Sequence, residues 1–364
     1  MPINFVTNGD CQIDQMGGTG SINFATASMA TRAGGFPSLD NVAFYYSAAL
    51  AAAVDVSQDN VHPLLGAAGK SAKVAVTTGI ATGAIPAAAI VGVGMGVVSQ
   101  TPGFVDVVGN FSYASLQFSL FTTVAGTYTC YVTAAFTHRL LFTFEIVAVA
   151  GRWQTYTYTL PPAQKNTFDV FGAQMGICLA AGANTQIALL NQYTTSAVIP
   201  WITASPRQAN FLSTAGNTLW LTDVMYTKTL GPVQFPRLSF VDSLSECQTL
   251  LAHTADYGGA RTMQSGGVRS KKNIAGATNI QFNYSMPRPM RNTTAFAQLS
   301  NPIFGVADPQ AFNFNTFADC SNTAVVTPPI GSNVVNLSAT GDVASAVTDR
   351  FDVGVLIDSN VYLF

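Results

Sequence analysis

The chain has 364 residues and a formal net charge of −2; 9% of its residues are charged and 48% are hydrophobic. Globular domains have about 25% charged residues, and so apolar a composition excludes an intrinsically disordered chain. The length allows two domains of ordinary size. Because so little charge is available to solvate the surface, we expect neighbouring subunits to cover much of it.

The sequence lacks the residues that several classes of function require. The 16 Lys and Arg residues are spread along the chain, and Arg32 is the one basic residue before residue 35, so no basic arm for nucleic acid is predicted. The three histidines form no ligand motif, and the cysteines are far apart, odd in number and without a CxxC pair. We therefore expect buried thiols, without disulfides, metal or cofactor. No basic segment precedes an apolar core at the N-terminus, so we expect no signal peptide and synthesis in the cytoplasm.

One segment is apolar enough to raise the question of a membrane. Ile80–Val98 is uncharged and rich in Ala, Val, Ile and Gly. It also contains Pro86 and four glycines, which disfavour a helix. We predict a buried or interface strand segment and no membrane insertion.

Short alternating runs of β-branched and aromatic residues dominate the first two thirds of the chain. Turn residues separate them at intervals of about ten residues, which is typical of an antiparallel sandwich. The clearest predicted strands are Ser115–Phe121, Thr127–Ala135, Leu140–Val149 and Trp153–Leu160. Further strands are expected at Met175–Ala180, Ile187–Leu190 and Leu219–Tyr226, the last with Leu219, Leu221 and Asp223 on one face.

Helical spacing of Val241, Leu244, Cys247 and Leu251 predicts one helix, over Ser239–Ala255, which starts with a cap at Ser239 or Ser243. The glycines and the basic run Arg269–Lys272 that follow suggest a flexible link. The strand pattern then returns at Ile280–Tyr284, Thr294–Leu299, Val334–Leu337 and Asp352–Leu356. The predicted fold is all-β: a jelly-roll-like antiparallel sandwich at 1–235, a short helical connector at 236–258 and a smaller β domain at 259–364.

Aromatic side chains are the best candidates for ligand contact, because the apolar face of a sugar ring stacks on them. The candidates are Trp153, Tyr156, Tyr158 and Trp220. The alternative is a place in the core or at an interface, which we favour for the two tryptophans; for the two tyrosines, which share one strand face, the alternatives are balanced.

No catalytic residue is predicted, because the carboxylates are too scattered to nominate a pair. Glu145 alternates with Phe144 and Ile146, so we expect it on a polar strand face rather than in an acid role. The run GVGMG at residues 92–96 has Val97 where the G-x-G-x-x-G motif of a dinucleotide site needs its last glycine, and the helix of such a site does not follow. The glycines indicate a close-packed or bulged strand.

The order of these features resembles bacteriophage tail-fibre and related virion proteins whose first domain is a jelly roll similar to carbohydrate-binding modules. The opening NGDCQIDQMG, Gly126-Thr-Tyr128, the run Trp153–Pro161 and the closing strand with Trp220 and Asp223 carry the resemblance. So do Pro236–Ser239 before the helix, Cys247-Gln248 and Pro289-Met290-Arg291. Leu39–Val42 and Thr249-Leu250 depart from the pattern, where Asp-Arg-Trp and a tyrosine pair are usual.

The resemblance implies a structural protein of a virus particle (fibre, decoration or shell subunit), made in the host cytoplasm. Its expected partners are itself, as a homo-oligomer with a trimer preferred, other virion proteins, and a glycan of the host surface. A carbohydrate-binding adhesion module is the alternative, and a glycan-degrading enzyme the third reading.

Overall fold

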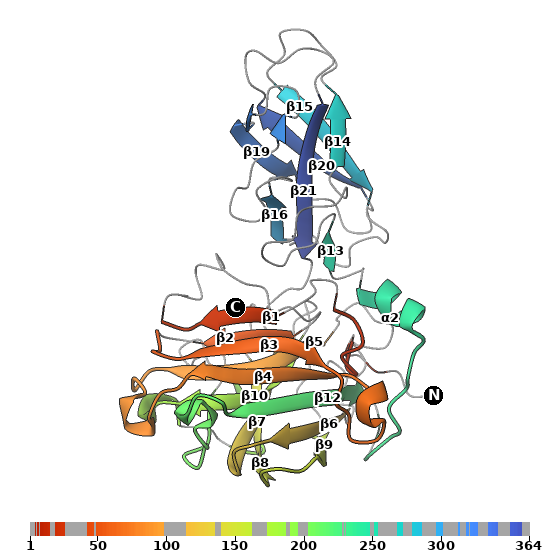
Figure 1. Ribbon diagram of the computed structural model, residues 1–364. Helices are drawn as coiled ribbons and strands as arrows, with labels where there is room; N and C mark the ends of the chain where they lie inside the picture. The colour runs from red at the N-terminus through yellow and green to blue at the C-terminus, as the bar shows by residue number, and fades with distance from the viewer. Residues whose placement is uncertain are drawn as a thin grey trace. The chain divides into compact units, whose positions relative to one another are not determined.

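The chain is all-β, with two antiparallel sheets in its N-terminal part and almost no helix in the described residues of this computed structural model (Figure 1). The structure describes residues 4, 6, 8–14, 19–25, 42–46, 49–97, 114–134, 140–161, 173–186, 190–195, 203–227, 229, 231–247, 251–253, 268–271, 279–285, 296–300, 312–313, 318–319, 321–326, 334–340 and 350–358. The described residues up to Ser243 form one compact unit and those from Leu244 form a second, a division that falls inside the predicted connector.

The first unit is a sandwich of two six-stranded antiparallel sheets. One sheet has the order β1-β3-β4-β12-β6-β9, and we call it the β12 sheet. The other, the β7 sheet, has the order β11-β8-β7-β10-β5-β2. The strands of the β12 sheet are β1 (Thr19–Asn23), β3 (Ala53–Asp59), β4 (Ser71–Thr78), β12 (Thr218–Thr227), β6 (Ala114–Thr122) and β9 (Gln154–Leu160). Those of the β7 sheet are β11 (Tyr193–Thr195), β8 (Leu140–Ala148), β7 (Gly126–Ala134), β10 (Ala173–Ala181), β5 (Ile90–Val97) and β2 (Val42–Tyr46).

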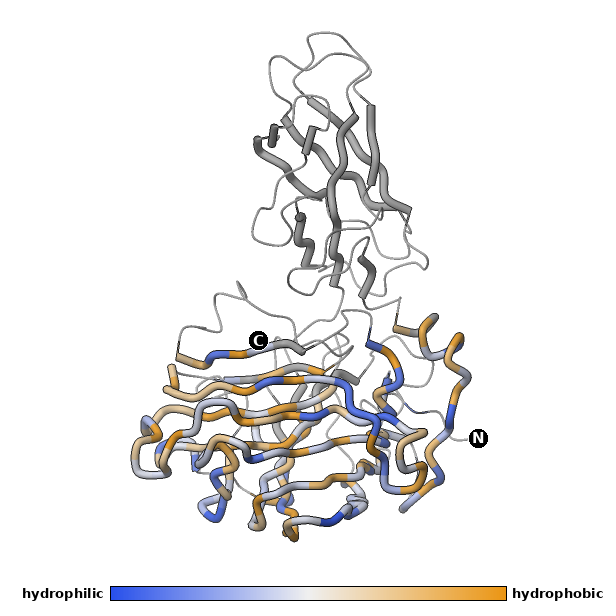
Figure 2. The backbone as a smooth tube through the Cα atoms, in the orientation of Figure 1, coloured by the Kyte–Doolittle hydropathy of each residue, from blue (hydrophilic) through white to orange (hydrophobic). Residues whose placement is uncertain are grey.

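The core lies between the two sheets because apolar residues alternate with polar ones along their strands (Figure 2). Leu116, Phe118 and Leu219 face inward from the β12 sheet, while Phe142 and Phe144 face inward from the β7 sheet. Short 3-10 turns connect strands at η1 (Gly66–Ala68), η2 (Thr82–Ala84), η3 (Ala183–Thr185) and η4 (Phe211–Ser213). The predicted antiparallel sandwich is confirmed.

The glycine-rich strand β5 is close-packed, as predicted. Gly94 lies opposite Gly176 of β10, and a Cβ atom built on Gly94 would lie 2.3 Å from the Met175 carbonyl oxygen. The β10–β5 pairing also has a register shift between Cys178 and Ala180. Side chains are excluded because the two backbones approach too closely to accommodate them.

The second unit is described here by its strands alone. One of its sheets has the order β13-β21-β17-β18, with β14 and β16 also paired to β21, and the other has the order β15-β20-β19. Their bounds are β13 (Leu251–His253), β14 (Val268–Lys271), β15 (Asn279–Ser285), β16 (Phe296–Ser300), β17 (Phe312–Asn313), β18 (Ala318–Asp319), β19 (Ser321–Val326), β20 (Val334–Thr340) and β21 (Arg350–Asp358).

Three predicted segments need correction. The helix α2 spans Phe240–Cys247 only, because Leu251–His253 pairs with β21 and sheet hydrogen bonds override its helical spacing. The basic residues Arg269 and Lys271 lie in strand β14, which pairs with β21, so Val268–Lys271 is not a flexible link. Residues 81–88 form a mostly exposed loop containing η2, so the buried strand of the apolar segment begins at Ile90. Some predictions fall outside the described residues. They concern 187–189 of an expected strand, 258–267 of the expected link, and His138.

Two further expectations, the cap of α2 and the buried cysteines, are confirmed in the described residues. Ser239 caps α2, since its hydroxyl accepts the Asp242 N–H at 3.2 Å and bonds the Asp242 carboxylate at 2.6 Å. Cys11, Cys130, Cys178 and Cys247 are buried free thiols; Cys320 is not described. No helix in the described part of the chain is long and apolar enough to cross a membrane.

Candidate functional site

Three aromatic side chains form a row across the outer face of the β12 sheet. Leu219 and Leu221 point into the core, so Trp220 between them points outward. The strand register sets Trp220 opposite Phe121 of β6 and opposite Lys73 of β4. Continuing the β6–β9 register past Gln154 sets Trp153 opposite Phe121. We call Trp153, Phe121 and Trp220 the aromatic row.

The rings of the aromatic row contact one another edge to face. The centroids of Phe121 and Trp220 are 5.1 Å apart at an interplanar angle of 89°, and those of Phe121 and Trp153 are 5.8 Å apart at 62°. All three side chains are partly exposed. The row therefore keeps aromatic surface in contact with solvent.

Charged groups fix the end of the row at Trp220. Its indole N–H donates to the Asp59 carboxylate at 2.9 Å. Lys73 Nζ lies 3.7 Å from the same carboxylate and 5.7 Å from the centre of the indole ring. Asp59 and Lys73 are each about a third exposed, so this end presents both a cation and an anion to solvent.

Rows of hydroxyl groups lie on each side of the aromatic row, two residues away along each strand. Thr155, Ser119 and Thr222 are in register on one side, and Thr123 and Thr218 pair on the other. Ser119 and Thr155 bond each other at 2.9 Å. Thr155 is exposed, as are Thr157 and Thr159 farther along β9. Ser119, Thr222 and Thr218 are buried, so Thr155 and Thr123 provide the exposed hydroxyl groups beside the row. An aromatic strip next to exposed hydroxyl groups can contact both the apolar face and the hydroxyl groups of a sugar.

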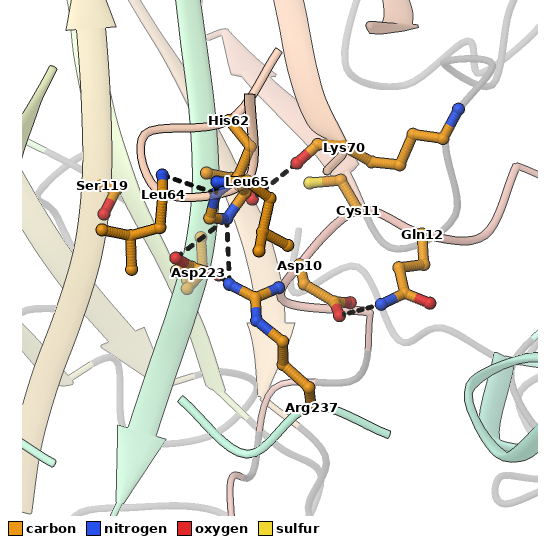
Figure 3. Close-up of polar contacts among 12 residues, drawn as sticks. Asp10, Cys11, Gln12, His62, Leu64, Leu65, Lys70, Ser119, Asp223 and Arg237 are labelled. Carbon is orange, nitrogen blue, oxygen red and sulfur yellow. Dashed lines mark hydrogen bonds and ion pairs between the residues drawn. The ribbon is translucent and has the colours of Figure 1, made fainter. Parts of the chain in front are cut away.

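The loop between β3 and β4 covers the part of β12 that follows the aromatic row (Figure 3). Thr222 donates its hydroxyl to the Lys70 carbonyl at 2.8 Å, and the neighbouring Asp223 accepts from His62 of this loop. Asp223 has a φ of 52° at a register shift of β12. The bulge turns Asp223 away from the inward face that we predicted it to share with Leu219 and Leu221.

His62 is buried, and both of its ring nitrogens form hydrogen bonds. Its Nδ1 accepts the backbone N–H groups of Leu64 and Leu65 at 3.0 and 3.2 Å. Nε2 therefore carries the proton of the neutral ring, and it donates to Asp223 at 3.0 Å. Both ring nitrogens are engaged, so His62 holds the loop in place and is not available as a general base.

Arg237 joins this cluster from the segment that leads to α2. Its guanidinium donates to Asp223 at 3.0 Å and lies 3.1 Å from His62 Nε2. Asp10 of the N-terminal loop accepts from Gln12 at 2.7 Å, and Figure 3 shows its carboxylate on the other side of the guanidinium. Burial raises the pKa of Asp10 above its usual value of 3.8, although Arg237 opposes the shift. We call His62, Asp223, Arg237 and Asp10 the polar cluster.

The predicted residues Tyr156 and Tyr158 lie on the other face of β9 from the aromatic row. Tyr158 stacks on Phe144 with ring centroids 4.0 Å apart and donates to Asn191 at 2.6 Å. Tyr156 packs against Phe118 and donates to the Val147 carbonyl at 2.9 Å. Both rings close the edge of the sandwich, so the structure brings together Trp153 and Trp220 but separates them from the two tyrosines.

Glu145 lies on the outer face of the β7 sheet, away from the core as expected. Its carboxylate accepts hydrogen bonds from Ser205 and Arg207. This partnered acid belongs to a surface ion pair. No group of three or more His, Cys, Asp or Glu side chains suited to a metal ion occurs among the residues that the structure describes.

Sequence reasoning missed Phe121, Lys73 and Asp59 as partners of Trp220. Their strand register was not visible in the sequence, because β4 and β12 are separated by about 140 residues along the chain. The available signal was the alternation in SLQFSLF, which sets Phe118 and Phe121 on opposite faces.

No protein-family model and no curated protein matches this chain. Among solved structures it is similar to the enzymatically active domain of tailspike protein 4 of bacteriophage CBA120, with 13% identity, 62% of this chain covered and a TM-score of 0.33. The match spans about a fifth (21%) of that tailspike chain.

The chain is also similar to a family 11 carbohydrate-binding module from Clostridium thermocellum, with 11% identity over 59% of this chain and 98% of that one, and a TM-score of 0.27. A family 30 carbohydrate-binding module shares 13% identity over 52% of this chain and 82% of that one, with a TM-score of 0.27. The structural neighbours of this chain thus include a phage tailspike domain and carbohydrate-binding modules.

Proposed function

We propose that this chain is a non-catalytic structural protein of a virus particle and that its sandwich contacts carbohydrate on the host surface through the aromatic row. The observation that carries the carbohydrate contact is the row itself, a partly exposed aromatic strip on the outer face of the β12 sheet with the exposed hydroxyl groups of Thr155 and Thr123 beside it. The virion context comes from the order of sequence motifs. Trp153 and Trp220 remain candidate contacts, and Phe121 joins them.

Folding alone does not require this row. The core of the sandwich is complete on the inner faces of the two sheets, and an outer face can be polar throughout. Three large aromatic side chains in register on three adjacent strands are costly to expose. A ligand or a partner that covers them accounts for their presence.

The row suits a sugar better than an apolar ligand. Its ring edges and faces offer C–H contacts, while Lys73, Asp59 and the exposed Thr155 can bond hydroxyl groups. Such contacts are individually weak, so useful binding needs many copies displayed together. A repeated virion subunit supplies these copies.

The absence of catalysis is part of the proposal. It is supported by the engagement of His62 at both ring nitrogens and of Glu145 with Arg207. Asp59, the carboxylate at the row, is already held by Trp220 and Lys73. A glycosidase needs a pair of carboxyl groups about 5–9.5 Å apart with one free to transfer a proton.

The test compares particles carrying wild-type protein, Trp220→Ala or Val147→Ala for adsorption to host-envelope polysaccharide. Val147 is an exposed apolar residue of the β7 sheet and serves as the control. We expect Trp220→Ala to lower adsorption at least about tenfold, and Val147→Ala to leave it unchanged. Equal adsorption by all three would overturn the carbohydrate site. Release of reducing sugars by the purified protein would overturn the non-catalytic assignment.

A free carbohydrate-binding adhesion module is the second candidate, favoured by the same aromatic row. The two differ in where the protein is found. If purified particles contain the chain in stoichiometric amounts, the structural role in the virion is supported. If they lack it, the free adhesion module is supported.

A further inference from the structure

No strand among the described residues pairs with the outer edge of β9. β9 is the last strand of the β12 sheet, and among the described residues β6 is its one strand partner (Figure 1). The β6–β9 register runs from Ala114–Leu160 to Leu120–Gln154 without a shift, so β9 is a regular strand. An edge of this kind presents a row of unpaired backbone donors and acceptors.

The hydrogen-bond pattern identifies which residues face outward. Thr123 donates its backbone N–H to Thr218, so the odd-numbered residues along β6 point toward β12 and the even-numbered ones toward β9. The opposite partners of the even residues are Gln154, Tyr156, Tyr158 and Leu160. The backbone groups of Thr155, Thr157 and Thr159 therefore point away from the sheet.

The sequence of β9 lacks the residues that usually protect an edge against strand pairing. Soluble proteins protect such edges with Lys, Pro, a bulge or an inward-pointing charge. The sequence QTYTYTL of β9 has none of these, and it consists of residues with high strand propensity. Tyr156 and Tyr158 also anchor the edge, through hydrogen bonds to the Val147 carbonyl of β8 and to Asn191 just before β11.

We propose that this edge is the interface with a second copy of the chain, in which two β9 strands pair antiparallel about a two-fold axis at Thr157. In that register Thr157 pairs with its own copy, and Thr155 pairs with Thr159 of the second copy. Each pair exchanges two backbone hydrogen bonds. The alternation of Thr and Tyr makes the segment complementary to itself, with threonines opposite threonines on the outer face.

The consequence is one continuous sheet that runs through two copies. It carries two aromatic rows on the same outer face, which is the arrangement that gives avidity for a repeated ligand. The interface does not depend on the carbohydrate contact, and its test has a different readout. It also differs from the trimer implied by the sequence resemblance, since a two-fold pair relates two copies.

The register makes a charge test possible on the full-length protein. Thr155→Lys with Thr159→Lys puts like charges opposite each other at both ends of the paired edge. Thr155→Lys with Thr159→Glu puts opposite charges there instead. We expect the first variant to weaken dimerisation at least about tenfold, measured by sedimentation, and the second to restore it at low salt.

A backbone variant tests the hydrogen bonds directly. Thr157→Pro removes one outward N–H and leaves the β6 pairing intact, because Pro is tolerated where the N–H faces outward. Thr157→Val is the matched control. We expect Thr157→Pro to be monomeric with an unchanged circular dichroism spectrum, and Thr157→Val to dimerise. If Thr157→Pro fails to fold, the charge pair decides the question.

Three results would overturn the proposal. The first is a wild-type chain that stays monomeric at about 100 µM, well above the concentration at which a specific interface associates. The second is a closed trimer. The third is equal behaviour of the two charge variants, which would point to another surface or to pairing of β9 with β1 of a neighbouring copy.

Discussion

Arg237 allows a direct test of the polar cluster. Replacing it with Met keeps most of the aliphatic stem and removes the guanidinium from Asp223, whose side chain is 7% exposed. Losing one partner of a fully buried ion pair costs about 3–5 kcal/mol. Arg237 itself is 32% exposed, so water can replace part of what it supplies. We therefore expect Arg237→Met to lower the free energy of unfolding of the sandwich by about 2 kcal/mol.

A double-mutant cycle separates the ion pair from other effects. Asp223→Asn removes the charge, and Asn tolerates the positive φ of this position. We expect a coupling energy of about 1.5 kcal/mol between the two substitutions. All three tryptophans of the chain precede Ser243, so their fluorescence during urea unfolding reports on the first unit. A coupling energy near zero, with each single variant as stable as the wild type, would refute the view that this cluster fastens the segment before α2 to the sandwich.

Two further substitutions test the buried acid and the glycine contact. Burial raises the pKa of Asp10, so its contribution to stability is present below about pH 3.8 and is lost as the pH rises through the raised value. The melting temperature of Asp10→Asn should therefore rise relative to that of the wild type between about pH 3.5 and pH 7. A difference in melting temperature that does not change with pH would contradict the assignment. Gly94→Ala should destabilise the sandwich by about 2–3 kcal/mol in urea unfolding, because its Cβ would lie 2.3 Å from the Met175 carbonyl oxygen. Gly83→Ala has open space around it and should change stability little; equal effects of the two would remove the steric argument.

The sequence was sufficient to predict the strands in the middle of the sandwich. Regular alternation in β6, β7, β8 and β9 predicted each of these strands to within about two residues. Apolar–polar alternation predicts these strands because each strand buries one face and exposes the other. It failed at Leu251–His253, where hydrogen bonds to β21 prevailed over helical spacing.

The sequence by itself determined an all-β chain with little charge, buried thiols and aromatic candidates on alternating strands. These properties follow from local composition and periodicity. The tertiary structure alone decided which aromatics stand together: register between strands far apart in sequence set Trp220 beside Phe121 and Lys73. It also turned Tyr158 into the sandwich against Phe144. The tertiary structure was also needed to show that Asp223 turns away from the inward face and bonds His62 and Arg237. The direction of this side chain depends on the left-handed backbone conformation of Asp223 at the bulge, which the sequence pattern does not reveal.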